Sequence, residues 1–351
     1  MVPSFSSKGF PYYLPDSWPH KSELPRQRKS VKSSSKRKFS DASLSLELTG
    51  PYIEDALLLS AYDLHFRLLD RPERFFGSKK LVFIDSGGYE LAPEFDATEP
   101  KQYRYRPRRP FGLSEYLRVL DDLPKTVPCV IANFDWGTRY RPVTQQIAKA
   151  RALFHRHPSS LSNFLIKPGT GAFLEIEKRV RPELSAMRGF AIVGVTEKEL
   201  GANLLTKLRT LASLRLAMDH CKMQEVPIHL WGGLDPLLVP LYFIAGAGIF
   251  DGVSWLRYAY HHGAAIAWDS NSVLKGRVAD SAMRARALTS GENLVVLESL
   301  ATSMKRLADN RASDFSVFNY YAEELEAAYR TMVAEIPELR STGSRRPVET
   351  I

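Results

Sequence analysis

Short apolar runs alternate with longer amphipathic stretches through most of this chain. Residues 81–85 (Leu-Val-Phe-Ile-Asp) are typical of the runs: four apolar residues in a row, as in a strand buried on both faces, end in a polar turn. The amphipathic stretches repeat apolar residues at spacings of three and four, which predicts helices. We expect strands within residues 56–62, 81–85, 127–135, 163–167, 189–195, 227–233, 249–253 and 264–268.

Helical stretches lie between and after these strands. We expect helices within residues 62–76, 113–123, 142–155, 173–187, 200–222, 236–245, 293–308 and 315–336. Pro182 is expected to split the fourth of them, because proline breaks the helical hydrogen-bond ladder. About eight strands that alternate with helices predict a (β/α)8 TIM barrel, and a doubly wound parallel sheet is the alternative.

Polar residues stand at the ends of the expected strands. In a parallel barrel the carboxyl ends of all strands lie on one rim, where binding and catalytic sites are built. The residues concerned are Asp85, Asp135, Lys167, Glu197 or Glu199, the Trp231-Gly232-Gly233 turn and Asp251. Their convergence on one rim predicts a functional site there.

The stretch Asp85-Ser86-Gly87-Gly88-Tyr89 (residues 85–89) is the most distinctive of these strand ends. A carboxylate followed by residues that let the backbone approach a ligand closely is typical of a binding site. A second strand ends in an aspartate in the same local context, at Asp251. The alternative for the first stretch is a strand that simply stops in an Asp-Ser-Gly-Gly turn.

The composition is that of an ordinary globular protein, with 44% hydrophobic and 25% charged residues over 351 positions. No apolar run is long enough to span a bilayer, and residues 1–19 lack the apolar core of a signal peptide. The two cysteines, Cys129 and Cys221, exclude a disulfide framework and have no partner at metal-ligand spacing. We therefore expect a reducing, cytoplasmic compartment, no membrane contact, no metal ion and no cofactor.

The formal net charge is +9, and much of it lies near the start of the chain. Residues 1–48 hold nine lysines and arginines against four acidic residues, a net charge of +5, in a Ser- and Pro-rich stretch. We expect a disordered basic arm that can bind phosphates, with a solvated tail as the alternative. The predicted organisation is this arm, a barrel with closing helices over residues 49–340, and a frayed tail over residues 341–351.

A second basic segment interleaves cationic and aromatic side chains. Residues 103–110 read Tyr-Arg-Tyr-Arg-Pro-Arg-Arg-Pro. Such a loop can grip phosphates and stack on bases, and a solvated basic loop is the alternative. The candidate nucleic-acid contacts in it are Arg104, Arg106, Arg108 and Arg109.

Asp85 and Asp251 form a candidate catalytic pair. One carboxylate can attack C1′ of a sugar to form a covalent glycosyl-enzyme, while a second carboxyl manages the proton of the departing group. If the leaving group and the acceptor are both nucleobases, the net reaction is base exchange. The carboxylates alone fit any glycosidase or lyase. A metal site made of Asp85, Asp135 and Asp251 is less favoured, because no His or Glu joins them at a suggestive spacing.

From about residue 81 to residue 262, the order of motifs resembles that of the tRNA-guanine transglycosylases, the queuine and archaeosine tRNA-ribosyltransferases. Residues 85–89 are similar to the family's Asp-Ser-Gly-Gly-Phe/Tyr loop, and residues 250–253 (Phe-Asp-Gly-Val) are similar to its nucleophile motif. The resemblance implies a barrel enzyme that replaces guanine in a polynucleotide by a 7-deazaguanine base, as in queuosine formation.

The resemblance also implies roles for single residues. Asp251 would be the nucleophile and Asp85 would assist proton transfer. Tyr89 would stack on the base, Asp135 would read the guanine edge, and Arg257 would contact a phosphate. The other base-site positions implied by the resemblance are Ser86, Gly87, Gly88, Lys167, Gly194, Glu199, Trp231 and Gly232.

The chain departs from the family's pattern at several places. Lys167-Pro168-Gly169 stands where the family has Gln-Gly-Gly, so one contact to the base is changed. Residues 269–351 contain no Cys and no His, so the family's zinc site, in a subdomain that helps to hold tRNA, is absent. This pattern suggests a divergent member that acts on another polynucleotide, such as the branch that inserts 7-deazaguanines into DNA. DNA and tRNA both stay open as substrates, as does a need for further subunits of a modification system.

Other interpretations of the site remain. The barrel could be a noncatalytic, nucleic-acid-binding subunit of a modification complex, although the presence of both Asp85 and Asp251 argues against a dead enzyme. A glycosidase that acts on free nucleosides is less favoured because of the basic charge. His229 is interpreted as a core histidine that points away from the cavity. Trp231 is interpreted either as core packing or as a base-stacking residue.

Overall fold

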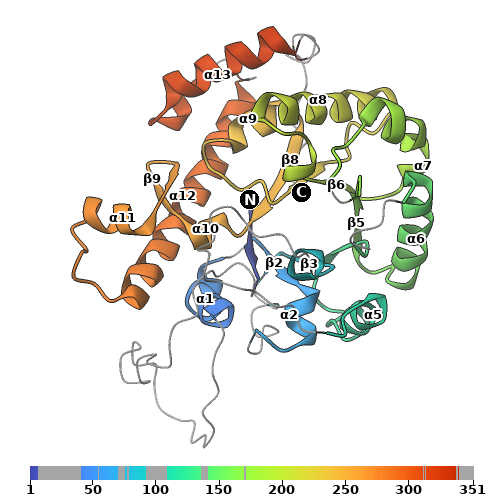
Figure 1. Cartoon of the computed structure of the whole chain (residues 1–351), viewed down its shortest axis with the longest axis horizontal. Coiled ribbons are helices and arrows are strands. Elements are labelled where there is room, and N and C mark those ends of the chain that lie inside the picture. The colour runs from blue at the N-terminus through green and yellow to red at the C-terminus, as the bar shows by residue number, and fades with distance from the viewer. Residues whose placement is uncertain are drawn as a thin grey trace, which may run out of the picture.

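Eight parallel strands close into a barrel in the computed structural model of this chain (Figure 1). The structure describes residues 1–6, 41–53, 55–69, 76, 79–91, 109–135, 141–169, 171–310, 312, 314–336 and 339. In order around the barrel, the strands are β1 (Val2–Phe5), β2 (Ala56–Ser60), β3 (Leu81–Asp85), β4 (Cys129–Ala132), β5 (Leu161–Ile166), β6 (Ile192–Thr196), β7 (Ile228–Trp231) and β8 (Ala247–Gly252). Every neighbouring pair is parallel, including β8 with β1, so the predicted (β/α)8 barrel is confirmed.

Helices cover the barrel from outside. The α-helices are α1 (Asp41–Thr49), α2 (Ala61–His65), α4 (Gly88–Leu91), α5 (Leu113–Asp121), α6 (Val143–Arg156), α7 (Leu184–Met187), α8 (Leu204–His220), α9 (Val239–Ile244), α10 (Ser254–Arg257), α11 (Trp268–Leu274), α12 (Ala282–Asp309) and α13 (Ala322–Glu335). Single turns of 3-10 or π helix lie at Gly50–Tyr52, Ile176–Val180, Arg181–Glu183, Glu197–Glu199 and Phe315–Phe318. As expected, the helical stretch around Pro182 is split into short pieces. No helix in the described part of the chain is both long and apolar enough to cross a membrane.

The first strand of the barrel lies at the very start of the chain. This contradicts the prediction of a disordered arm over residues 1–48, because residues 2–5 form β1 and Asp41–Thr49 form α1. Four residues beside a basic, Ser-rich stretch give no periodic signal, and β1 is held only by strands distant in sequence, β2 and β8. Residues 7–40, which hold all nine of the early lysines and arginines, lie outside the described residues, as do residues 341–351.

The last predicted strand lies outside the barrel. Residues 264–268 were expected to close the sheet, but β10 (Ala264–Ile266) pairs antiparallel with β9 (Ala259–His261) in a hairpin. The place between β8 and β2 is already filled by β1, so no position is left for this segment. The hairpin packs with α11 against α12 at one side of the barrel (Figure 1).

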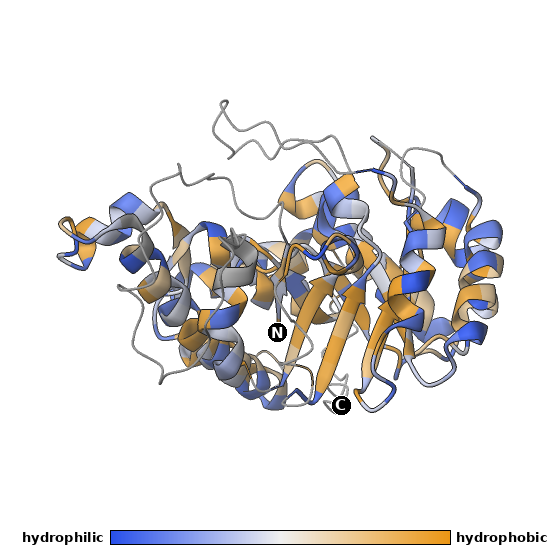
Figure 2. Cartoon of the chain, turned by 90° about the horizontal axis from the view of Figure 1, so that it is seen from below, coloured by the Kyte–Doolittle hydropathy of each residue, from blue (hydrophilic) through white to orange (hydrophobic). Residues whose placement is uncertain are grey.

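Side chains that face the barrel interior change from apolar to polar towards the carboxyl ends of the strands. The apolar layer consists of Val2, Leu58, Phe83, Val130, Ala132, Leu165, Ile192 and Trp231. Successive side chains of a strand point to opposite faces, so the residue two positions further along also points inward. In this way Ser4, Ser60, Asp85 and Lys167 reach the mouth of the barrel. The strands themselves are mostly hydrophobic (Figure 2), which leaves the polar groups concentrated at one end.

We predict that Phe5→Ala lowers the free energy of unfolding by about 3–5 kcal/mol, because it leaves a cavity in a packed core. Phe5 is 0% exposed and its ring packs edge-on against Trp255 at 5.3 Å between ring centroids. Urea denaturation would measure the change. Phe173→Ala is the matched control, since Phe173 is 48% exposed, and it is expected to stay within about 0.5 kcal/mol of wild type. Equal stability of the two variants would contradict the placement of β1 in the barrel.

Candidate active site

Asp251 on β8 accepts hydrogen bonds from three donors. Ser4 Oγ donates to Asp251 Oδ2 at 3.0 Å, and the backbone N–H of Gly232 donates to Oδ1 at 3.0 Å. His229 Nε2 lies 3.1 Å from the same Oδ1. Asp251 is only 5% exposed, so these donors supply the partners that a buried carboxylate needs. The predicted nucleophile therefore lies in the mouth of the barrel, in one defined orientation.

His229 on β7 is a core residue, but it does not point away from the cavity. It is fully buried, its Nε2 contacts Asp251, and its Nδ1 lies 2.7 Å from Asn163 Nδ2. The interpretation as a histidine directed away from the site is therefore wrong. In the strand alternation His229 shares the inward face with Trp231, and the register of β7 against β8 sets it opposite Ile249, close to Asp251.

Asp85 ends β3 in a different environment. Its Oδ1 accepts the backbone N–H of Ser86 at 2.7 Å. Burial, and then the nearby charge of Glu90, raise the pKa of Asp85 to about 8, while the Ser86 hydrogen bond opposes the rise and the carboxylates of Asp251 and Asp135 add to it. Asp85 is therefore a carboxyl group that holds a proton near neutral pH.

Glu90 on α4 supplies part of this electrostatic effect. It is buried, and it accepts hydrogen bonds from Ser60 Oγ at 2.7 Å and from Ser6 Oγ. Ser60 ends β2 and Ser6 follows β1, so the ends of these two strands meet at the Glu90 carboxylate, next to Asp85 at the end of β3. The side chain of Glu90 thus links the residues after β1 to the helix that follows Asp85.

The signature loop brings Asp85 and Asp135 together. Gly87 has a φ of +81°, which favours glycine, and it starts the turn out of β3. A Cβ on Gly88 would lie 2.7 Å from Asp135 Oδ2, so the carboxylate can rest there only because the side chain is absent. Ser86 Oγ accepts the backbone N–H of Asp135 at 3.1 Å. Ser86 and Gly88 are therefore explained by their contacts with the loop after β4, and Gly87 by its backbone conformation.

Lys167, just after β5, forms a charged cluster with two acids. Its Nζ lies 2.6 Å from Glu199 and 3.5 Å from Asp135. Burial lowers the pKa of Lys167, but the two carboxylates raise it by more, so the pKa is raised overall. Burial also raises the pKa of Glu199, against the effect of Lys167. Of the two glutamates considered, Glu199 is thus the one in the cluster, whereas Glu197 contacts Lys207 and Tyr242.

Tyr89 and Arg257 meet at the edge of the mouth. Arg257 Nη2 donates to the Tyr89 hydroxyl at 2.6 Å, which joins α4 to α10. Tyr89 is 37% exposed, so its ring is accessible. Arg109 is exposed, whereas Arg104, Arg106 and Arg108 lie outside the described residues.

Three further predicted base-site residues, Gly194, Trp231 and Gly232, have packing or hydrogen-bonding roles. Trp231 belongs to the apolar layer inside the barrel and stacks on His229 with ring centroids 4.3 Å apart. A Cβ on Gly194 would lie 2.5 Å from Trp231 Nε1, so this glycine makes room for the indole. Gly232 supplies its N–H to Asp251. The core-packing alternative for Trp231 is therefore the one that its burial favours.

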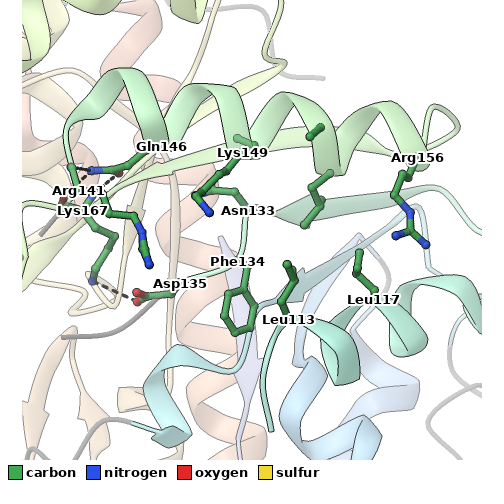
Figure 3. A pocket seen from close by; sticks show the side chains of 13 residues that line it. Leu113, Leu117, Asn133, Phe134, Asp135, Arg141, Gln146, Lys149, Arg156 and Lys167 are labelled. Atoms are coloured by element: carbon green, nitrogen blue, oxygen red, sulfur yellow. Dashed lines mark hydrogen bonds and ion pairs between the residues drawn. The ribbon is translucent and has the colours of Figure 1, made fainter. Parts of the chain in front are cut away.

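A groove of about 250 Å³ opens beside Asp135 and Lys167, between α5 and α6. Figure 3 shows Arg141, Lys149 and Arg156 on one side of it and Leu113, Leu117 and Phe134 on the other. Gln146 holds its inner end, because its side chain accepts the N–H of Lys167 at 3.0 Å and donates to the Lys167 carbonyl at 2.8 Å. A groove with cations on one wall and apolar side chains on the other suits a ligand that is both anionic and apolar.

Sequence reasoning missed Ser4, Ser60, Glu90 and Asn163. Ser4 was assigned to the arm, and the other three have no motif of their own. Side chains alternate between the two faces of a strand, and this alternation could have indicated Ser60 and Asn163, since both share a face with the apolar layer. Within the described ranges, no group of three or more His, Cys, Asp or Glu side chains is arranged to hold a metal ion.

We predict that Glu90→Gln lowers the pKa of Asp85, because the charge of Glu90 is one cause of its rise. Carbon-13 NMR of the labelled aspartate carboxyls would follow the titration, with a wild-type midpoint of about 8. Glu177→Gln, at an exposed glutamate paired with Arg181, is the matched control and should leave that midpoint unchanged. A wild-type midpoint at the ordinary value of 3.8 would contradict the placement of Asp85 in a desolvated site beside Glu90.

The same shift makes the stability of the fold depend on pH. Asp85 holds its proton more tightly in the folded chain, at a pKa of about 8, than at its ordinary value of 3.8. Its contribution to the free energy of unfolding is therefore fully present below the lower value and is lost as the pH rises through the higher one. Asp85→Asn should reduce this loss, and urea denaturation over that pH range would measure it.

No model of a known protein family matches this chain, and no curated protein matches it either. The resemblance to the transglycosylases therefore rests on the short sequence motifs alone. The function of the chain is therefore inferred from the chemistry of the described side chains.

Proposed function

We propose that this protein is a base-exchange transglycosylase, which replaces guanine in a polynucleotide by a 7-deazaguanine through a covalent glycosyl-aspartate. The observation that supports it best is the contrast between two carboxyl groups in one barrel mouth. Asp251 accepts three hydrogen bonds as a carboxylate, whereas Asp85 has a pKa of about 8. A nucleophile and a proton donor with separate environments are what a two-step displacement at C1′ requires.

The proposed first step begins with attack of Asp251 on C1′ of the target nucleotide. The bond from Asp251 to C1′ forms while the bond from C1′ to N9 of guanine breaks, and its electron pair stays on the base. Asp85, protonated below about pH 8, gives its proton to the departing base. In the second step the entering base returns a proton to Asp85 and its nitrogen displaces Asp251 from C1′. The net change is one base for another, without water.

The cluster of Asp135, Lys167 and Glu199 is the proposed reader of the base. Its two carboxylates exceed its one ammonium group, so it favours a ligand edge rich in N–H donors, such as the N1–H and amino group of guanine. Tyr89, exposed beside the mouth and held by Arg257, is placed to stack on the base.

A polynucleotide is the proposed substrate because of charge and access. The chain carries a net charge of +9, and the groove beside Asp135 carries Arg141, Lys149 and Arg156. Cations of this kind contact phosphates without reading sequence. The target nucleotide must leave any duplex stack to reach a mouth this narrow, which costs a few kcal/mol.

We predict that Asp251→Asn abolishes exchange of radiolabelled guanine, by at least about a thousandfold, because the amide is no longer a nucleophile. The assay uses purified protein on bulk tRNA, double-stranded DNA and single-stranded DNA, with wild type and Asp122→Asn as the active references. Asp122 is exposed at the far end of α5, so its change should leave exchange intact. The circular dichroism spectrum of Asp251→Asn should match that of wild type.

The outcomes of this assay separate the interpretations. Incorporation into DNA alone would support a DNA base-exchange enzyme, and incorporation into tRNA would support a tRNA enzyme without the zinc site. Labelled guanine still incorporated by Asp251→Asn would refute the nucleophile. No incorporation by wild type on any polynucleotide would favour the noncatalytic subunit.

We further predict that the rate of exchange falls as the pH rises through about 8, because Asp85 must carry a proton to assist the departing base. The measurement is kcat over a pH series on the preferred polynucleotide. In Glu90→Gln the descending limb should move to lower pH, in parallel with the NMR midpoint of Asp85. A limb that stays in place while the midpoint moves would assign the proton transfer to another group.

A further inference from the structure

A chain of buried contacts crosses five consecutive strands of the barrel, from β5 to β1. Asn163 on β5 lies 2.7 Å from His229 on β7, and His229 lies 3.1 Å from Asp251 on β8. Ser4 on β1 donates to the other oxygen of Asp251 at 3.0 Å. Asn163 and His229 are 0% exposed, so neither side chain can satisfy its polar atoms with bulk water.

The contact between Asn163 and His229 passes over β6, and it depends on Gly194 in that strand. This strand lies between β5 and β7, and Gly194 is paired with Leu165 on one side and with His229 on the other. A Cβ on Gly194 would lie 2.9 Å from Asn163 Oδ1, closer than side-chain atoms pack. The missing side chain therefore opens the path by which Asn163 reaches His229.

The contacts select one tautomer of His229. A carboxylate only accepts hydrogen bonds, so the ring nitrogen that faces Asp251 must carry a proton, and that nitrogen is Nε2. In a neutral ring Nδ1 is then an acceptor and needs a donor. Asn163 Nδ2 is that donor. The amide thus holds the imidazole in the form that donates to Asp251.

The donors are divided unequally between the two oxygens of Asp251. Oδ1 accepts from His229 and from the N–H of Gly232, whereas Oδ2 accepts, among the residues that the structure describes, from Ser4 alone. A carboxylate oxygen has about two acceptor positions, so Oδ1 is fully occupied and Oδ2 keeps one lone pair. Oδ2 is therefore the oxygen with electrons available for a new bond.

We propose that Asn163 and His229 are positioning residues for the nucleophile: they anchor Oδ1 of Asp251 and direct Oδ2 at C1′. The proposal rests on the proposed base exchange. The bond from Oδ2 to C1′ forms as the bond from C1′ to the base nitrogen breaks, and the departing base takes the electron pair and the proton of Asp85. When the entering base later displaces Oδ2, the electron pair returns to the carboxylate, and the donors on Oδ1 stabilise the charge that reappears.

The first test compares three substitutions by their effects on kcat and KM for exchange. His229→Leu removes the donor and should lower kcat by roughly 100-fold, the effect of a small misplacement of a reacting group. KM should change little, because His229 lies beneath Asp251 and does not reach the substrate. His229→Gln keeps an N–H donor and should recover part of the loss. Phe83→Leu is the matched control: Phe83 packs edge-on against His229 at 5.5 Å between ring centroids, within the apolar layer, and its change should leave kcat close to wild type.

The second test reads the tautomer without any substrate. Nitrogen-15 NMR of labelled histidine should find His229 protonated at Nε2 in wild type. Asn163→Asp places a carboxylate against Nδ1, so only a doubly protonated ring can still donate to Asp251. Its kcat should then show a second descending limb, where the ring loses a proton, in addition to the Asp85 limb that wild type shows. The titratable group that contacts the ring is Asp251 on β8, whose charge in turn acts on Asp85 on β3.

The two tests separate this proposal from the proposed function. A ring protonated at Nδ1 in wild type, or a His229→Leu variant with wild-type kcat, would overturn the positioning role while exchange itself stands. If His229→Leu does not fold, the tautomer and the pH limb of Asn163→Asp decide the matter. If wild type exchanges no base on any polynucleotide, the function fails and the positioning role falls with it, whichever tautomer is found.

Discussion

Three hydrogen bonds to one buried carboxylate depend on the closure of the whole barrel. Ser4 reaches Asp251 from β1, His229 and Gly232 reach it from β7 and the turn after it, and Asp251 belongs to β8. Ser4 arrives there only because β1 pairs with β8, and the same pairing closes the sheet. A buried carboxylate without donors would be costly, so closure and the orientation of Asp251 support each other. The segment that completes the fold is also the segment that completes the candidate site.

The charged groups in the mouth of the barrel each have different hydrogen-bond or ion-pair partners. Asp251 has donors on both oxygens, whereas Asp85 has one backbone donor. The pKa of Asp85 reaches about 8, first because of desolvation and second because of the nearby carboxylate of Glu90. Lys167, just after β5, pairs with Asp135 after β4 and with Glu199 after β6. The surroundings of the two carboxyl groups thus differ although the residue type is the same, and the proposed displacement makes use of this difference.

Much of the fold follows from local pattern. Seven of the eight barrel strands lie within or beside apolar runs visible in the sequence, and the rim residues Asp85, Asp135, Lys167 and Asp251 follow from the rule that parallel strands end together. The prediction from local pattern was wrong where the position of a segment depends on strands far along the chain. Val2–Phe5 is too short to have a period, and Ala264–Ile266 has a strand-like composition but forms a hairpin because β1 occupies its place.

The class of fold, the carboxylates at the rim and the Ser-Gly-Gly turn could be predicted from local sequence, because these features depend on neighbours within a few residues. The side chains that touch those carboxylates are known only from the folded chain. His229 looks like a core histidine from its apolar neighbours, yet its ring nitrogen faces Asp251 and its other nitrogen faces Asn163 across Gly194. The contact with Asp251 joins two neighbouring strands and the contact with Asn163 spans three, and strand register, set by the closure of the barrel, brings them together. No local pattern encodes that register.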